Sequence, residues 1–226
     1  MRAYRYFDLI VAGFVAVLLC SNLIGPGKVA MVGGLAFGVG NIFFPISYIF
    51  GDVLTEVYGY ARARRAIWAG FAAMLFATLM SYAVVHLPVD PSEPYNATIQ
   101  PALATVFGST WRIVAASILA FVVGDFVNSY VLARMKVWTA GRWLWARTIG
   151  STVVGQGFDS LIFYPVAFAG VWSGDKLFVV TLTSWAFKVA VEALCTPLTY
   201  LVVNGLKRAE REDFYDRDTD FSPFKL

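Results

Sequence analysis

The chain consists mostly of apolar runs of about twenty residues, separated by short polar or basic segments. A run of this length is what an α-helix needs to cross the hydrocarbon core of a bilayer. The pattern predicts six such helices, at about residues 7–24, 42–58, 66–87, 111–132, 151–172 and 177–206. We therefore expect an all-α, polytopic membrane protein with one six-helix transmembrane domain over residues 1–206. A charged, solvated and partly disordered tail is expected over residues 207–226.

The second apolar segment is interrupted at its start. Residues 29–40 are apolar but contain four glycines, so they are too flexible for a regular helix. We expect a short irregular, re-entrant or strand-like lead-in there, and a helix opened by Asn41 and Pro45 after it. Because non-helical backbone at membrane depth is tolerated where it lines a cavity, this interruption indicates a nearby site. Between the third and fourth helices, residues 88–101 are expected to form a polar loop.

Basic residues gather at one set of segment ends. The opposite ends carry only Lys28, Arg112 and Lys176. The basic clusters are Arg2 and Arg5, Arg62 to Arg65, Arg134 to Arg147, and Lys207 to Arg211. The positive-inside rule then predicts that both termini are cytosolic. Because the basic residues gather at helix ends, as membrane topology requires, the net charge of +3 does not indicate nucleic-acid binding.

Composition and motifs exclude several classes of function. Cys20 and Cys195 each lie within an apolar run, which fits neither a disulfide framework nor metal-ligand spacing. No P-loop, HExxH, GxSxG or CxxC motif is present. We therefore expect no cofactor, no metal and no enzymatic activity.

Eight polar side chains lie inside the apolar runs. An ionisable group at bilayer depth costs about 3 kcal/mol or more, so such groups are usually functional. The set is Asp52, Glu56, Asp125, Asn128, Gln156, Asp159, Lys188 and Glu192. The first two share a helix face because they are four residues apart, and so do the last two. Since carboxylates outnumber the single lysine, the set requires protons, a cation or a donor-rich ligand.

Each feature also has a structural explanation. Lys188 can pair with Glu192 or with a carboxylate on a neighbouring helix such as Asp125, and then only fixes helix register. Asp52 can be held by Arg62 or Arg65. The glycines beside the polar residues can serve close helix packing alone.

Three blocks of the sequence resemble the bacterial queuosine-precursor transporters, once catalogued as vitamin uptake transporters. The blocks are GDVLTEVYG at residues 51–59, RTIGSTVVGQGFDS at residues 147–160 and KVAVEALCTP at residues 188–197. They occur in this order, and the resemblance covers nearly the whole chain except the tail and the polar loop at residues 88–101.

The resemblance implies a multi-pass importer in the bacterial inner membrane, with a 7-deazaguanine base and the lipid bilayer as its partners. The substrate would be 7-cyano-7-deazaguanine, or its aminomethyl form, for queuosine salvage. A carboxylate can accept from the N–H and amino groups of a guanine-like edge, and an amide can donate to its carbonyl. Glu56 or Asp159 is expected in the first role and Gln156 or Asn128 in the second. The expected charge-balancing residues are Lys188 and Glu192, with Asp52 and Asp125 in charge balance or coupling.

Two other functions fit the same pattern. Six short helices also resemble the substrate-binding component of an energy-coupling-factor transporter. A membrane-embedded enzyme could use Asp52 and Glu56 as acid and base. The small residues Ala12 and Ala16 share a helix face and would permit close docking, including a homodimer.

Overall fold

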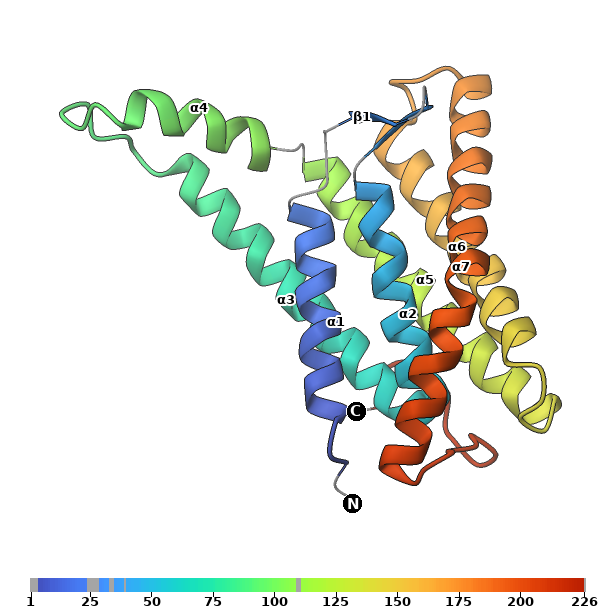
Figure 1. The fold of residues 1–226 in the computed structure, drawn as a ribbon. Coiled ribbons are helices and arrows are strands. Elements are labelled where there is room, and N and C mark those ends of the chain that lie inside the picture. The colour runs from blue at the N-terminus through green and yellow to red at the C-terminus, as the bar shows by residue number, and fades with distance from the viewer. Residues whose placement is uncertain (1–3, 24–28, 33–34, 39, 109–110, 226) are drawn as a thin grey trace.

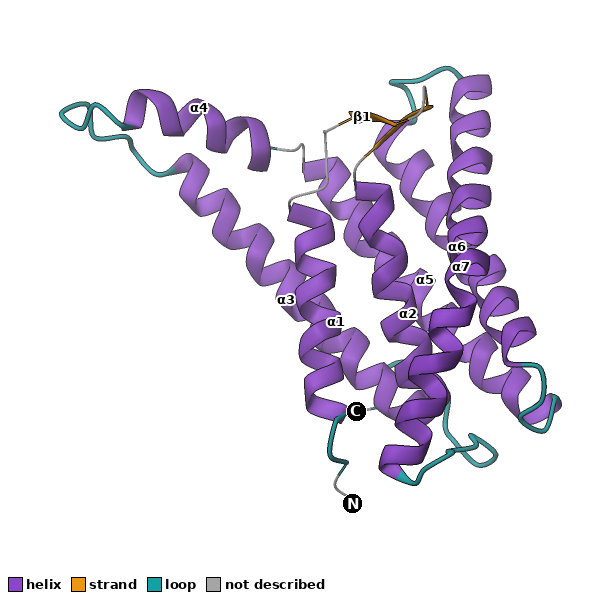
Figure 2. Ribbon diagram, viewed as in Figure 1, coloured by secondary structure: helices purple, strands orange, loops and turns teal. Residues whose placement is uncertain are grey.

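The computed structural model describes residues 4–23, 29–32, 35–38, 40–108 and 111–225. Within them the regular secondary structure is helical except for one short hairpin, and loops connect the elements (Figures 1 and 2). In chain order the elements are α1 (Phe7–Leu23), β1 (Val29–Val32), β2 (Leu35–Gly38), α2 (Gly40–Tyr58), α3 (Tyr60–His86), α4 (Asn96–Phe107), α5 (Trp111–Trp138), α6 (Leu144–Phe168) and α7 (Gly174–Glu210).

The glycine-rich lead-in contains a two-stranded antiparallel hairpin. Val29 pairs with Gly38 and Val32 pairs with Leu35. The hairpin lies at the end of the molecule opposite the chain termini (Figure 1). The strand-like lead-in is therefore confirmed, and the all-α expectation holds apart from this element.

Several expected boundaries differ from the structure, and three of the differences concern the start of a helix. Helix α3 begins at Tyr60 because Gly59, with a φ of 84°, turns the chain directly from α2 into α3. Helix α4 begins at Asn96, so the expectation of a polar loop as far as residue 101 is wrong; Pro101 lies inside this helix. Helix α6 begins at Leu144, well before the expected start at residue 151.

Among the described residues, three helices are long and apolar enough to cross a membrane: α3, α5 and α7. A shorter apolar helix covers Phe7–Asn22 in α1. The count of six spans, and the orientation of the termini, remain predictions.

Four helices form a closed ring of contacts. Helix α2 packs against α5 and α7, and α6 packs against the same two helices. Helices α1 and α3 also pack on α2, and α3 packs on α5. The core along α2 includes Val53, Leu54 and Val57, all nearly inaccessible to solvent. Because α2 is covered on several sides, the polar residues on its last turns are buried as well.

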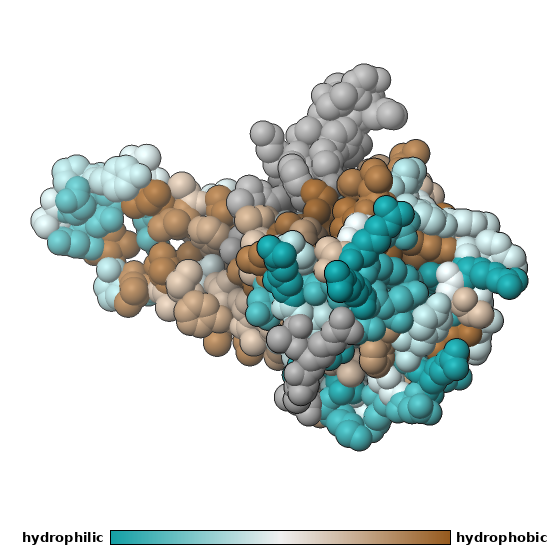
Figure 3. All heavy atoms as spheres, turned by 60° about the horizontal axis from the view of Figure 1, so that its bottom comes forward, coloured by the Kyte–Doolittle hydropathy of each residue, from teal (hydrophilic) through white to brown (hydrophobic). Residues whose placement is uncertain are grey.

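The basic ends of the helices lie together at the end of the molecule that carries both termini (Figure 1). Figure 3 shows this end, where hydrophilic residues gather, with apolar residues along the sides. The distribution is the one that a membrane protein requires, with a polar end and an apolar belt.

The charged tail packs across this end of the ring. We call residues 211–225 the strap. Asp216 in the strap is only 2% exposed, and Tyr60 on α3 donates a hydrogen bond from its hydroxyl to the Phe221 carbonyl, at 3.0 Å. Aromatic and backbone groups of the strap thus find partners on the helices. The expectation of a partly disordered, solvated end stays a prediction.

Candidate functional site

Helices α5 and α6 approach closely through two facing glycines. A Cβ added at Gly155 would lie 2.6 Å from Asn128 Cβ and 2.9 Å from the Gly124 carbonyl oxygen. A Cβ added at Gly124 would lie 2.9 Å from Asp159 Cβ. These two glycines therefore allow close helix packing, whereas Gly51 has nothing within 4 Å. The close approach sets Asn128 and Asp159 against the facing helix.

Buried polar atoms without a hydrogen-bond partner gather on the four ring helices. Asn128 Nδ2 donates to Asp52 Oδ1 at 2.7 Å, which leaves Asp52 Oδ2 and Asn128 Oδ1 without partners. Gln156 Oε1 and both oxygens of Glu192 are also unpartnered. The exposed fraction of all four residues is 5% or less. Since a buried polar group without a partner costs free energy, these atoms are candidates to contact a ligand.

Electrostatic interactions connect these groups across the ring. The Asp52 carboxyl interacts with those of Glu192 and Asp125. The Tyr48 side chain on α2 interacts with Gln156 and Asp159 on α6. Seven of the eight expected residues therefore belong to one region: Asp52, Asp125, Asn128, Gln156, Asp159, Lys188 and Glu192.

Lys188 forms an ion pair with Asp159 on the neighbouring helix. Their side chains are 12% and 15% exposed. Of the partners considered from the sequence, Lys188 thus takes a carboxylate on another helix, and Glu192 keeps both of its oxygens unpartnered. The expected Asp52–arginine contact is also not formed, because Asn128 holds Asp52 instead.

Glu56 lies in a different environment, within an ionic layer at the terminal end of the ring. Its Oε1 lies 2.8 Å from Arg147 Nη2, 2.6 Å from Lys207 Nζ and 3.4 Å from Lys136 Nζ. The Lys136 ammonium also donates to the Glu56 backbone carbonyl at 2.6 Å. Asp213 of the strap accepts from Lys136 at 2.5 Å and from Lys207 at 2.8 Å.

Sequence reasoning missed this layer. Lys136, Arg147 and Lys207 were counted only as cytosolic charges that set topology, yet Lys136 and Arg147 are each 1% exposed. One signal was present, since Arg147 opens the second of the three family-like blocks. With three cations near Glu56, the carboxylate excess applies to the other region of the ring and not to this one.

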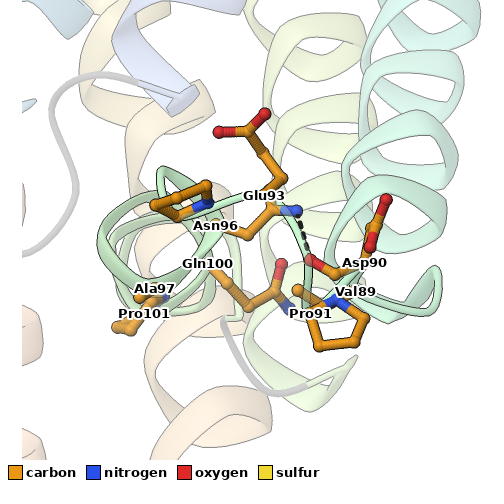
Figure 4. Close-up of a pocket in the computed structure, with 9 residues that line it drawn as sticks. Val89, Asp90, Pro91, Glu93, Asn96, Ala97, Gln100 and Pro101 are labelled. Atoms are coloured by element: carbon orange, nitrogen blue, oxygen red, sulfur yellow. Dashed lines mark hydrogen bonds between the residues drawn. The ribbon is translucent and has the colours of Figure 1, made fainter.

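A separate pocket lies at the opposite end, in the turn between α3 and α4 (Figure 4). It is lined by prolines and by Asp90, Glu93, Asn96 and Gln100. The Glu93 backbone N–H donates to the Asp90 carbonyl at 3.4 Å, as the dashed line in Figure 4 shows. Because these side chains are largely exposed, the pocket lacks the desolvated polar groups found in the ring.

Comparison with known proteins identifies the family. Residues 38–202 match a family described as "Putative vitamin uptake transporter". The chain belongs to this family. It is 34% identical over 88% of its length to the "Probable queuosine precursor transporter" of Bacillus subtilis strain 168, and covers 84% of that protein. It is 29% identical over 67% of its length to the "Queuosine precursor transporter" of Escherichia coli strain K12, and covers 66% of it. No solved structure matches the chain.

Family membership and the apolar helices together define a multi-pass membrane protein. The matched region contains the whole polar region of the ring, from Asp52 to Glu192. The two relatives are named as transporters and not as enzymes. The unpartnered atoms of this region are mostly acceptors, so a ligand that contacts them must supply several donors.

Proposed function

We propose that this chain imports 7-deazaguanine precursors of the tRNA nucleoside queuosine, 7-cyano-7-deazaguanine or its aminomethyl form, across the bacterial inner membrane. The names of the relatives support this substrate class. The basic helix ends support a cytosolic position for both termini.

The binding model rests on the carboxylate of Glu192. Its two oxygens are fully buried and have no partner. A guanine-like edge presents an N–H and an amino group side by side, which two carboxylate oxygens can accept together. Glu192 therefore accepts the donor edge of the base in this proposal.

The other residues take supporting roles. The Gln156 amide, which also bonds the Tyr48 side chain, donates its second N–H to the base carbonyl in this proposal. Tyr48 offers a flat surface beside Gln156 for the ring. Asp159 and Lys188 form a charge-balanced pair, and Asp52 and Asp125 remain proposed for charge balance or coupling. Glu56 becomes a structural residue, because three cations surround its carboxylate.

The test uses a bacterial host that cannot synthesise the precursor but is supplied with 7-cyano-7-deazaguanine. We expect queuosine in tRNA only when the chain is present. Glu192→Gln should lower the uptake rate about tenfold or more, because an amide replaces one acceptor with a donor. The exposed Glu93→Gln variant is the matched control and should transport normally. Absence of queuosine with properly inserted protein would reject the substrate, and normal uptake by Glu192→Gln would reject the binding model.

A further inference from the structure

The ionic layer receives one charged side chain from each helix of the ring. Glu56 lies on α2, Lys136 on α5, Arg147 on α6 and Lys207 on α7. Glu56 is one helical turn beyond Asp52, so the layer lies between the candidate binding region and the terminal end of the molecule. A molecule that leaves the ring at this end must pass through the layer.

The strap closes the layer from outside. Asp213 binds Lys136 and Lys207, and the Phe214 carbonyl accepts from Lys136 at 2.8 Å. The Phe214 ring lies against Gly59, where an added Cβ would be 2.3 Å from it. The strap therefore places the Asp213 carboxylate and the Phe214 side chain at the end of the helix ring that carries the chain termini.

Helix α3 holds the outer part of the strap. The Tyr60 backbone N–H donates to the Asp216 carboxylate at 3.1 Å. Arg64 donates to the Ser222 carbonyl at 2.6 Å, and the Trp68 indole donates to the Pro223 carbonyl at 2.7 Å. These contacts are on the outside of the ring, so they can anchor the distal strap while residues near Asp213 move.

We propose that the strap is the gate at the terminal end of the transport path, and that Asp213 must leave Lys136 and Lys207 for the path to open. This inference rests on the proposed function. The asymmetry of burial supports it: the Asp213 side chain is 44% exposed, whereas that of Lys136 is 1% exposed. Because Asp213 is already partly hydrated, its departure into water disturbs the packing much less than separating the helices around the buried Lys136 would.

Release of the strap also changes the net charge of the ionic layer. The closed layer has two carboxylates, Glu56 and Asp213, against three cations. Without Asp213, two positive charges are in excess and water must enter to solvate Lys136. Opening the gate thus hydrates the end of the path.

The test is the accessibility of a buried thiol in the full chain. Cys20 and Cys195 are replaced by alanine, and Ser129→Cys is introduced as the reporter. Ser129 is 1% exposed and lies beside Thr55, one residue from Glu56 in sequence. A membrane-impermeant methanethiosulfonate reagent is applied to vesicles in which the end of the protein that carries both termini faces outward. We expect slow labelling, and about tenfold faster labelling when Asp213→Asn and Phe214→Ala are combined.

Asp218→Asn is the matched control, because it removes the same charge from an exposed position of the strap. It should label as slowly as the parent. If Phe214→Ala prevents insertion, Asp213→Asn alone provides the comparison. Equal labelling rates in the Asp213 and Asp218 variants would overturn the gate. Faster labelling without any uptake of the deazaguanine base would retain the gate and reject the substrate, so the two failures are distinguishable.

Discussion

Glu56 and Glu192 are both fully buried carboxylates on helices of the ring, yet their surroundings are opposite. Three cations contact Glu56, whereas neither oxygen of Glu192 has a partner. Removing one member of a buried ion pair lowers the stability of a protein, because the other charge is left uncompensated. The two residues should therefore respond differently to substitution: Glu56 through stability and Glu192 through uptake.

Glu56→Gln is expected to destabilise the protein by about 3 kcal/mol or more, because it leaves Arg147 and Lys136 without their buried counter-charge. The measurement is the thermal unfolding midpoint in detergent. Lys225→Gln is the control, since it breaks only the exposed pair with Asp220 and should leave the midpoint unchanged. An unchanged midpoint in Glu56→Gln would contradict a structural role for the layer.

The Lys188–Asp159 pair provides a second test at this scale. Asp159→Asn alone leaves a cation at membrane depth and should lower the unfolding midpoint. The double variant with Lys188→Met should regain part of the loss, because no charge then remains unpaired. Losses that simply add would argue against the pair. Uptake by the stable double variant shows separately whether the pair contacts the base.

At the scale of elements, the contact between α5 and α6 positions the polar region. Gly124 and Gly155 let the backbones approach, and the same contact places Asn128 beside α6. If α5 and α6 moved apart, the distance between the acceptor atoms on the two helices would change. Small residues at this contact therefore serve the geometry of the site as well as packing.

Gly155→Ala should destabilise the protein by about 1–3 kcal/mol, since its new methyl group would overlap Asn128 and the Gly124 carbonyl. Uptake should fall as well, because Asn128 is displaced. Gly205→Ala on α7 is the matched control. It has open space around it, so the substitution should be neutral or slightly stabilising. The unfolding midpoint and the uptake rate are measured for both, and equal behaviour would refute the packing argument.

At the scale of the whole molecule, the strap joins the last residues of the chain to α3 and to the ionic layer. Burial tends to raise the pKa of Asp213, but the hydrogen bonds from Lys136 and Lys207 outweigh it and hold the pKa below its ordinary value of 3.8. Burial raises the pKa of Asp216 above that value, despite its bonds with Thr219 and Tyr60. The two carboxyl groups thus affect docking in opposite directions as pH changes.

We expect docking of the strap to weaken in acid through Asp213. A lowered pKa stabilises the docked state above the ordinary pKa, and this contribution is lost as the pH falls through the folded value. Asp216 works in the opposite sense, because its raised pKa favours docking when it is protonated. The labelling rate of the Ser129→Cys reporter should therefore accelerate below about pH 4, once it is divided by the rate for a fully exposed cysteine at the same pH. This normalisation is needed because the reagent reacts with the thiolate, whose fraction falls in acid for both cysteines. In Asp213→Asn the acceleration should disappear, and its persistence would mean that another group controls the strap.

Much of this molecule could be predicted from the sequence alone. Apolar runs of membrane-spanning length predicted the helices, and polar residues inside them marked most of the groups that the ring brings together, including Asp52, Gln156 and Glu192. These inferences succeeded because hydrophobic periodicity and the cost of burying charge act locally along the chain. The start of α4 was missed, since the prolines of that segment indicated a loop.

Tertiary structure alone decided which charges meet. From the sequence, Lys136, Arg147 and Lys207 belonged to solvated loops, and the strap was a solvated tail. Long basic side chains can turn back to a distant carboxylate, and nothing in the spacing of Glu56 specifies partners from three other helices. Sequence therefore determined which groups must be buried or exposed, whereas helix packing determined their partners, because pairing depends on distances across the fold.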